Sequence, residues 1–383
     1  MADLSELIER EFPQDPSVAY LNHAGVAPWP QRAARAAEAF ARECVARGAS
    51  HYRDWEATEA RLREQLRNLI NAPSVDDIAL LKNTSEGLSC VAFGLDWQSG
   101  DNVVISDQEF PANRLVWEAL ASRGVEVRKA CLADADTPEN ALLNLCDDRT
   151  RVLAISSVQY ATGLRMDLGH LGAFCRNRET LFCVDAIQSI GAVPVDVQAI
   201  DADFVAGDGH KWMLGAEGVA VFYCRAEVRP QLRLNEFGWH TVTDPMNFDR
   251  QEWTIAESAK RFECGSLNML GIHVLSASLS LLQDVGMDVV SRNVLNKTQY
   301  IIDYIDDSKN IFCVTPAAEE RRAGIVSFRA GSGDQRPLYR QLQENGVVCA
   351  LRHNAVRFSP HFYTRDEVLK RALAIVGDYA GRP

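Results

Sequence analysis

The chain has 383 residues, of which 47% are hydrophobic and 24% charged, as in an ordinary globular protein with room for a large and a small domain. Its formal net charge of −12 argues against nucleic acid as a partner, and no apolar stretch is long enough to cross a membrane. The ten cysteines are scattered singly, without a CxxC pair or a Cys/His cluster, so we expect no metal site. Several cysteines lie inside apolar runs and are expected to be buried, reduced thiols, which favours a cytoplasmic location, and the acidic N-terminus lacks an apolar signal segment.

Hydrophobic periodicity predicts helices over residues 3–11, 31–47 and 52–71 in the first part of the chain. Strands and helices then alternate. The expected strands are 78–81, 103–105, 125–127, 152–156, 181–184, 204–206 and 219–223, and the expected helices among them are 85–93, 113–123 and 168–176. This alternation predicts an α/β fold with a largely parallel sheet that helices cover.

The pattern changes after about residue 261. Helices are expected at 272–283, 289–305 and 364–379, and short strands near 311–314, 325–328 and 347–351. We therefore expect an N-terminal helix (1–19) that packs with the small domain, a large domain (20–260) and a small α+β C-terminal domain (261–383). Ligands of a parallel sheet lie at the carboxyl ends of its strands.

Two side chains at neighbouring strand ends indicate the chemistry. Lys211 ends the glycine-containing segment 207–211 after one apolar run, and Asp185 closes the strand expected at 181–184. Taken alone, Lys211 would be a surface charge and Asp185 the N-cap of the next helix. Together they suit pyridoxal phosphate (PLP): the lysine forms a Schiff base with the aldehyde, and the aspartate keeps the ring nitrogen protonated.

Several other residues have a binding interpretation beside a structural one. Thr84 and Ser85 stand between a strand and a helix, where they could bind a phosphate or cap the helix. Phe110 could stack on a pyridine ring or pack in the core. Gln188 could donate to the cofactor's phenolic oxygen or face solvent. Arg357 could hold a substrate carboxylate or form a structural ion pair.

Together these residues resemble the class V aminotransferase family of fold-type I PLP enzymes. That group includes cysteine desulfurases, selenocysteine lyases, C–S lyases, kynureninases and isopenicillin-epimerase-like proteins. The similarity extends from the segment 20–24 to Arg357, and its most specific parts are the Asp185-x-x-Gln188 motif and the Gly-His-Lys motif at 209–211. It implies the PLP-dependent transferase fold of type I, in which a large domain with a mainly parallel seven-stranded sheet precedes a smaller α+β domain.

The resemblance also assigns further roles. It implies a homodimer with active sites at the interface, in which Ser266 lends its hydroxyl to the phosphate of the neighbouring subunit. His210 would hold the phosphate or position Lys211. Asn22 and His23 would lie with Arg357 at the substrate.

The chain departs from the family's pattern at four places. Asp208 stands where a phosphate-binding Ser or Thr is common, Phe110 where desulfurases usually have a histidine, and Tyr160 where they have an asparagine. Desulfurases also carry a nucleophilic cysteine on a flexible loop before the carboxylate arginine. Here Cys349 lies in the apolar run 347–351, which leaves no room for such a loop and disfavours a thiolate.

We therefore expect a PLP-dependent enzyme that acts on a small α-amino acid, with Lys211 as the general base. A transaminase is the first interpretation. A cysteine or cystine C–S lyase, or a desulfurase-like β-elimination, is the alternative, and epimerisation stays open. Remote alternatives are a non-catalytic PLP-fold regulator and a nucleotide-binding module; the absence of a GxGxxG or P-loop motif weighs against the latter.

Overall fold

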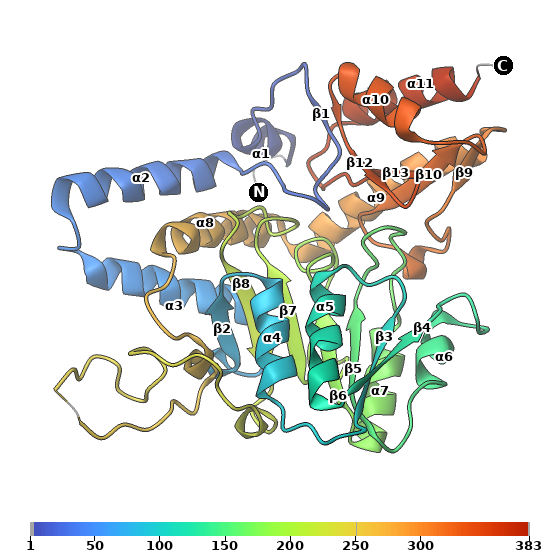
Figure 1. The fold of residues 1–383 in the computed structure, drawn as a ribbon. Coiled ribbons are helices and arrows are strands. Elements are labelled where there is room, and N and C mark those ends of the chain that lie inside the picture. The colour runs from blue at the N-terminus through green and yellow to red at the C-terminus, as the bar shows by residue number, and fades with distance from the viewer. Residues whose placement is uncertain (1–3, 250, 382–383) are drawn as a thin grey trace.

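The computed structural model describes residues 4–249 and 251–381 and is built around a seven-stranded sheet (Figure 1). Its strands are β2 (Ile78–Leu81), β3 (Asn102–Ser106), β4 (Glu126–Ala130), β5 (Thr150–Ser156), β6 (Leu181–Asp185), β7 (Phe204–Asp208) and β8 (Ala220–Cys224). The order across the sheet is β2-β8-β7-β6-β5-β3-β4. Only β8 runs against its neighbours, so the other six strands end at the same edge. The predicted α/β fold with a mainly parallel seven-stranded sheet is confirmed.

Helices cover both faces of this sheet, which is why most of its strands are apolar along their whole length. The helices are α2 (Gln31–Arg47), α3 (Tyr52–Leu69), α4 (Thr84–Gly94), α5 (Ala112–Glu118), α6 (Pro138–Leu143), α7 (Leu168–Arg178) and α8 (Met269–Val285). α4 and α5 pack on the strand residues of one face, such as Val103 and Ala206. α3, α6, α7 and α8 cover the other face, which includes Val104 and Val205. α2 packs against α8 and extends away from the sheet (Figure 1).

The C-terminal region contains a second, antiparallel sheet with the order β12-β13-β10-β9. Its elements are α9 (Met287–Asp306), β9 (Ile311–Cys313), β10 (Val326–Ala330), α10 (Arg336–Glu344), β11 (Val347–Val348), β12 (Ala350–Arg352), β13 (Ala355–Phe358) and α11 (Asp366–Ala380). Ile301 of α9, Leu338 of α10 and Leu369 of α11 share a separate core with Phe328 and Phe358 of the sheet. A smaller α+β unit therefore follows the large sheet, as predicted.

The single strand expected at 347–351 is two strands. β11 pairs in parallel with β1 (Ala19–Tyr20), whereas β12 pairs with β13, and Cys349 lies between them. The two pieces belong to different sheets because their partners lie in different parts of the chain. His353 and Asn354, with φ of 45° and 58°, form the turn from β12 into β13.

Packing differs from the expected domain division at two points. α8 packs with α2 and α3, and α9 contributes Val294 to the core of the large sheet and Ile301 to the C-terminal core. The boundary between the core of the large sheet and the C-terminal core therefore lies within α9 and not at residue 261. α1 (Leu4–Glu11) places Ile8 against the larger core, whereas Phe12, directly after the helix, stacks on Tyr363, and β1 pairs with β11 of the C-terminal unit.

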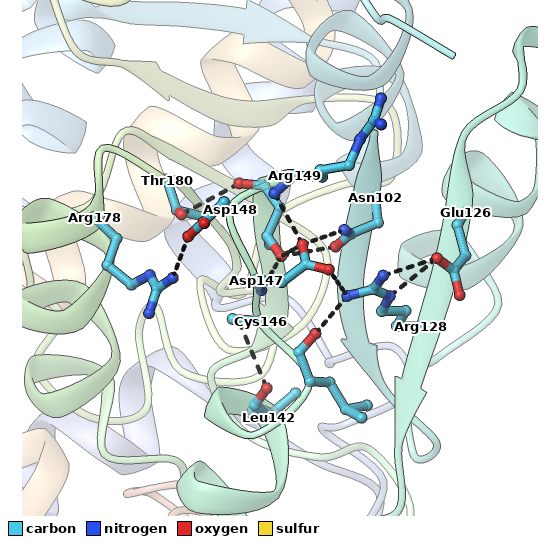
Figure 2. A network of polar contacts seen from close by, with 12 residues as sticks. Asn102, Glu126, Arg128, Leu142, Cys146, Asp147, Asp148, Arg149, Arg178 and Thr180 are labelled. Atoms are coloured by element: carbon cyan, nitrogen blue, oxygen red, sulfur yellow. Dashed lines mark hydrogen bonds and ion pairs between the residues drawn. The ribbon is translucent and has the colours of Figure 1, made fainter. Parts of the chain in front are cut away.

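A polar network closes the amino-terminal edge of the large sheet (Figure 2). The Asp147 carboxylate accepts hydrogen bonds from Asn102 at the start of β3, from Arg128 on β4 and from the amide of Arg149 before β5, at 2.6 to 2.9 Å. The Arg128 hydrogen bond, more than any other, holds the pKa of Asp147 below its usual range. The network joins three strands at the edge opposite the predicted site.

Within residues 4–249 and 251–381, no single helix is long and apolar enough to span a membrane, and only the pair α8 and α9, bent by 86°, passes such a test together. The same part of the chain holds no group of three His, Cys, Asp or Glu side chains arranged for a metal ion.

Candidate active site

The predicted site residues gather where strands of the large sheet end. Asp185 is the last residue of β6, and Lys211 follows β7. Phe110 follows β3, and Thr84 begins α4 directly after β2. Arg357 enters from β13 of the C-terminal sheet, so the site lies where the two units meet.

Lys211 is half-buried at this edge of the sheet. Its Nζ lies 5.7 Å from the centre of the Phe110 ring. Burial lowers the pKa of the amine from 10.5 to about 8, which the nearby Asp185 carboxylate opposes and Arg357 reinforces. A lysine with a lowered pKa can act as nucleophile and base near neutral pH.

Asp185 is 2% exposed, and its Oδ1 accepts a hydrogen bond from the Ile187 amide at 3.0 Å. Burial raises the pKa of its carboxyl to about 7, and the Lys211 charge acts against this shift. A cation in contact with this carboxyl would favour its ionised form. The position therefore suits the predicted pairing with a protonated ring nitrogen.

Gln188 is buried rather than solvated. Its amide nitrogen donates to the Ala24 carbonyl at 3.1 Å, and its amide oxygen accepts from the Trp212 indole at 2.9 Å. The second amide hydrogen stays available for a ligand.

Asp208, which departs from the family's pattern, has a partner in the next histidine. Its Oδ1 lies 2.9 Å from His210 Nδ1, close enough for an ion pair but poorly aligned for a hydrogen bond. A protonated His210 would neutralise Asp208, and this would remove the repulsion that the carboxylate exerts on a phosphate.

The turn between β2 and α4 is where a phosphate is expected. Asn83 is the N-cap of α4, since its Oδ1 accepts from the Glu86 amide at 2.9 Å. Thr84 is buried, and its hydroxyl oxygen accepts from the Asp208 amide at 3.1 Å, which leaves the hydroxyl proton free to donate. Ser85 is exposed at the same helix start. Both hydroxyls lie at a helix N-terminus, which favours an anion.

Arg357 is a buried cation without an acidic partner in the described part of the chain. Arg357 is 1% exposed. Its Nη1 donates to the Tyr160 carbonyl at 2.7 Å, and its Nη2 donates to Asn22 Oδ1 at 3.3 Å. Its Nε has no partner among the described atoms. Burial lowers the pKa of the guanidinium to about 9. Since buried arginines normally pair with an anion, this geometry suits a substrate carboxylate.

The side chains of Asn22 and His23 have different surroundings in the structure. Asn22 reaches Arg357 and can position it. The expectation that His23 contacts the substrate is wrong, because its ring is fully buried and both nitrogens are occupied. Nδ1 lies 2.8 Å from the Ser359 carbonyl and Nε2 lies 2.7 Å from the Tyr363 hydroxyl. His23 ties the N-terminal segment to the C-terminal unit.

Ser266 is exposed on the loop that leads into α8, in a cavity that Lys82 and Glu86 also line. Its predicted contact with the phosphate of a neighbouring subunit stays a prediction.

The family profile described as "Aminotransferase class-V" matches residues 19–369. The chain belongs to the class V aminotransferase family. This class V protein is 30% identical to a "probable cysteine desulfurase" of Methanothermobacter thermautotrophicus, with 98% of each chain covered. It is 31% identical to a cysteine desulfurase of Pectobacterium carotovorum, with 94% of this chain and 89% of that protein covered.

Solved structures agree with this membership. The cystine C–S lyase C-DES, in complex with its reaction product cysteine persulfide, superimposes with a TM-score of 0.89 at 25% identity, over 96% of this chain and 99% of that one. An apo cysteine desulfurase from Thermococcus onnurineus shows the same fold, with a TM-score of 0.87 at 22% identity over 99% of both chains. The predicted family, the type I fold and the family's PLP cofactor are confirmed. The relatives favour the C–S lyase alternative over the transaminase.

The class V site rests on a buried carboxylate that sequence analysis missed. Glu109 is 5% exposed and accepts hydrogen bonds from Ser106, Asn113, Ser156 and Gln159. This cluster fixes the backbone directly before Phe110. The spacing of Ser106, Glu109 and Asn113 was the available signal, but Gln159 and Ser156 come from a distant strand.

The glycines of the class V lysine segment serve packing rather than ligand approach. A Cβ on Gly207 would lie 3.2 Å from Ile190, and one on Gly209 would lie 3.0 Å from the Leu275 side chain of α8 and from the Val219 carbonyl. Both positions keep the chain close to neighbouring elements, which fixes the backbone that carries Lys211.

Cys349 of the class V protein is buried, and burial raises the pKa of its thiol to about 12. A thiol in such surroundings is a poor nucleophile, because the thiolate is the reactive form. The structure therefore agrees with the expectation that Cys349 is embedded in the fold.

Proposed function

We propose that this class V protein is a PLP-dependent C–S lyase that releases a sulfur leaving group from cysteine or cystine by β-elimination. One observation carries the proposal: the half-buried amine of Lys211 and the guanidinium of Arg357, which has no acidic partner among the described residues, form a site for an amino acid, while burial keeps the Cys349 thiol near Arg357 protonated. Elimination needs no cysteine nucleophile, whereas persulfide formation on the enzyme does. The names of the relatives support C–S bond cleavage.

The residues divide the work as follows. PLP, when bound, withdraws electrons from the substrate Cα and so weakens its C–H bond. Arg357 would hold the α-carboxylate with its unused Nε–H and Nη–H donors. Lys211, whose lowered pKa suits a base near neutral pH, would remove the Cα proton. Asp185 would favour a protonated ring nitrogen when the cofactor is bound.

These side chains fit PLP and an amino acid because each one could gain a counter-charge or a hydrogen-bond partner from them. Asp185 is a buried carboxyl that a cation would stabilise, and Arg357 is a buried cation that an anion would stabilise. Thr84 and Ser85 offer hydroxyl donors at a helix start on the third side of the site. A zwitterionic amino acid on a phosphate-bearing pyridine would complement all of them.

The test is a substrate panel on purified protein loaded with PLP. L-Cysteine and L-cystine should yield pyruvate together with sulfide or persulfide, and Lys211→Ala should abolish both products. Amino-acid donors offered with an α-keto acid acceptor serve as the transaminase control. A keto acid product in that control, with no sulfur released from either sulfur substrate, would refute the lyase proposal.

A further inference from the structure

The replacement of histidine by Phe110 leaves the departing sulfur without an evident proton donor. Sulfur leaves Cβ with an electron pair, and a positioned acid speeds that step. A phenyl ring has no proton to give. Lys211 and Arg357 are already assigned to the Cα proton and the carboxylate. Lys211 holds a proton only after it has taken that of Cα, so a separate acid that is protonated from the start would let both steps proceed together. This inference rests on the proposed function.

Tyr160 connects the two ends of the site. Its carbonyl accepts from Arg357 Nη1 at 2.7 Å. Its ring packs edge-on against Phe110, with ring centres 5.1 Å apart, and Lys211 Nζ lies 5.7 Å from the centre of that same Phe110 ring. A substrate held by Arg357 with its Cα toward Lys211 would extend Cβ and its sulfur beside Tyr160.

The Tyr160 hydroxyl also has a fixed partner that can reach water. It lies 2.9 Å from Nε2 of His353, an exposed residue in the turn between β12 and β13. Arg329 supports this turn by donating to the His353 carbonyl at 3.3 Å. The pair therefore provides a path for protons from solvent to the site, through the His353 imidazole to the Tyr160 phenol. Histidine is the side chain that most often moves protons in catalysis.

We propose that Tyr160 is the general acid that protonates the leaving sulfur, and that His353 positions its hydroxyl and returns a proton from water. Lys211 takes the Cα proton, and the electrons of that C–H bond form a Cα–Cβ double bond as the Cβ–S bond breaks. The Cβ–S electron pair stays on sulfur, which takes the phenol proton. Cysteine then gives hydrogen sulfide and cystine gives cysteine persulfide, while the carbon skeleton adds water and leaves as pyruvate and ammonium. No oxidant or reductant is required.

The test compares two leaving groups in Tyr160→Phe. Hydrosulfide is a much poorer leaving group than chloride, so a proton donor should speed its departure from L-cysteine and should matter little for chloride departure from β-chloro-L-alanine. With cysteine, kcat/KM should fall by about 100-fold or more, the usual contribution of a positioned acid. Initial rates of pyruvate release from β-chloro-L-alanine should stay near those of the wild type. The matched control is Tyr339→Phe on α10, which removes one phenol hydroxyl far from Lys211 and should change neither rate.

Two further measurements separate an acid from a structural role. The dissociation constant of glycine, which has no leaving group, should be unchanged in Tyr160→Phe when it is followed by the absorption spectrum. His353→Asn, which suits the left-handed turn, should slow cysteine turnover less than Tyr160→Phe and should leave β-chloro-L-alanine turnover intact. Equal loss on both substrates, weakened glycine binding or unchanged cysteine turnover in Tyr160→Phe would overturn the assignment. A wild-type enzyme that releases pyruvate from none of the substrates would refute the proposed lyase itself.

Discussion

At the scale of single residues, the site is defined by charges that lack partners. Arg357 is buried without a carboxylate in the described chain, and Asp185 is buried with its pKa raised to about 7. Both arrangements cost free energy until a ligand of opposite charge arrives. Arg357 and Asp185, which the sequence analysis proposed as binding residues, are therefore charged groups that the fold buries without an ion-pair partner among the described residues.

Arg357→Met should lower kcat/KM for cysteine by about 10- to 100-fold, because hydrogen bonds to a charged group contribute about 1.5 to 3 kcal/mol. Cysteamine, which lacks the carboxylate, is the matched substrate. It should react poorly with the wild type, and the substitution should not slow it further. A parallel loss on both compounds in steady-state assays would show that Arg357 acts on something other than the carboxylate.

Asp185 should make the stability of the cofactor-free protein depend on pH. Burial raises the pKa of its carboxyl from 3.8 to about 7, so the folded state retains a proton that the unfolded chain releases between these values. The cost of Asp185 therefore grows as the pH rises from about 4 to about 7 and is constant above that. Asp185→Asn should gain stability over the wild type at pH 8, on the order of a few kcal/mol, and about a third of that at pH 5. Urea unfolding at both values is the measurement; an equal difference at the two pH values would contradict the linkage.

Sequence reasoning singled out Lys211 and Asp185 because each is a charge that ends or follows an apolar strand, and Arg357 because a charge inside a short apolar strand needs a partner. The structure brings the three side chains to one region, and their roles stay predictions. It misjudged His23, whose two partners, Ser359 and Tyr363, lie at the other end of the chain. A polar residue next to a strand has the same sequence signal whether it faces a ligand or a distant hydrogen-bond partner.

At the scale of elements, the ends of strands and the starts of helices position the candidate site residues. The predicted strands of the large sheet were confirmed because apolar runs between helices leave few alternatives in an α/β sheet. α6 and α10 were not predicted. The division of 347–351 into β11 and β12 was also missed, because the partners of the two pieces are not local.

The loop before α8 is anchored by a buried ion pair that offers a second stability test. Arg63 of α3 donates two hydrogen bonds to Glu263 at 2.7 and 2.8 Å, and Glu263 also accepts from the Leu80 amide of β2 at 2.7 Å. Arg63→Met would leave this carboxylate buried and unpaired, and should lower the free energy of unfolding by about 3 to 5 kcal/mol.

Arg67 on the same helix is the matched control, because its pair with Glu64 is largely exposed. Arg67→Met should cost less than about 1 kcal/mol. Denaturant titrations of the two variants should therefore differ clearly. Similar midpoints would mean that the Glu263 network contributes little to stability.

At the scale of the whole molecule, the candidate active site lies between two units of the chain, and the family resemblance predicts that a second subunit contributes to it. We expect size-exclusion chromatography with light scattering to report twice the 42.5 kDa of one chain. Ser266 lies exposed at the loop before α8, where it is free to reach another copy.

Mixing variants tests whether Ser266 acts across the interface. Ser266→Ala should lose PLP more readily on dialysis, and Lys211→Ala should be inactive. If the two are unfolded and refolded together, hybrid dimers will contain one complete site, made of Lys211 from one subunit and Ser266 from the other. Activity should then rise above the sum of the separately refolded variants. No gain from mixing, with hybrids shown to form, would place both residues in the same subunit's site.

The pairing of β1 with β11 also has a consequence for biosynthesis. The His23 ring contacts the carbonyl of Ser359, a residue that is synthesised 336 positions later. At a synthesis rate of about 5 to 20 residues per second, the N-terminal segment stays without its partners for roughly 20 to 70 seconds. Asn22, which orients the guanidinium of Arg357, lies in that segment. The nascent polypeptide therefore completes its carboxylate pocket only after residues 357–359 have been synthesised, and a chain released before that point lacks the arginine that would bind the substrate carboxylate.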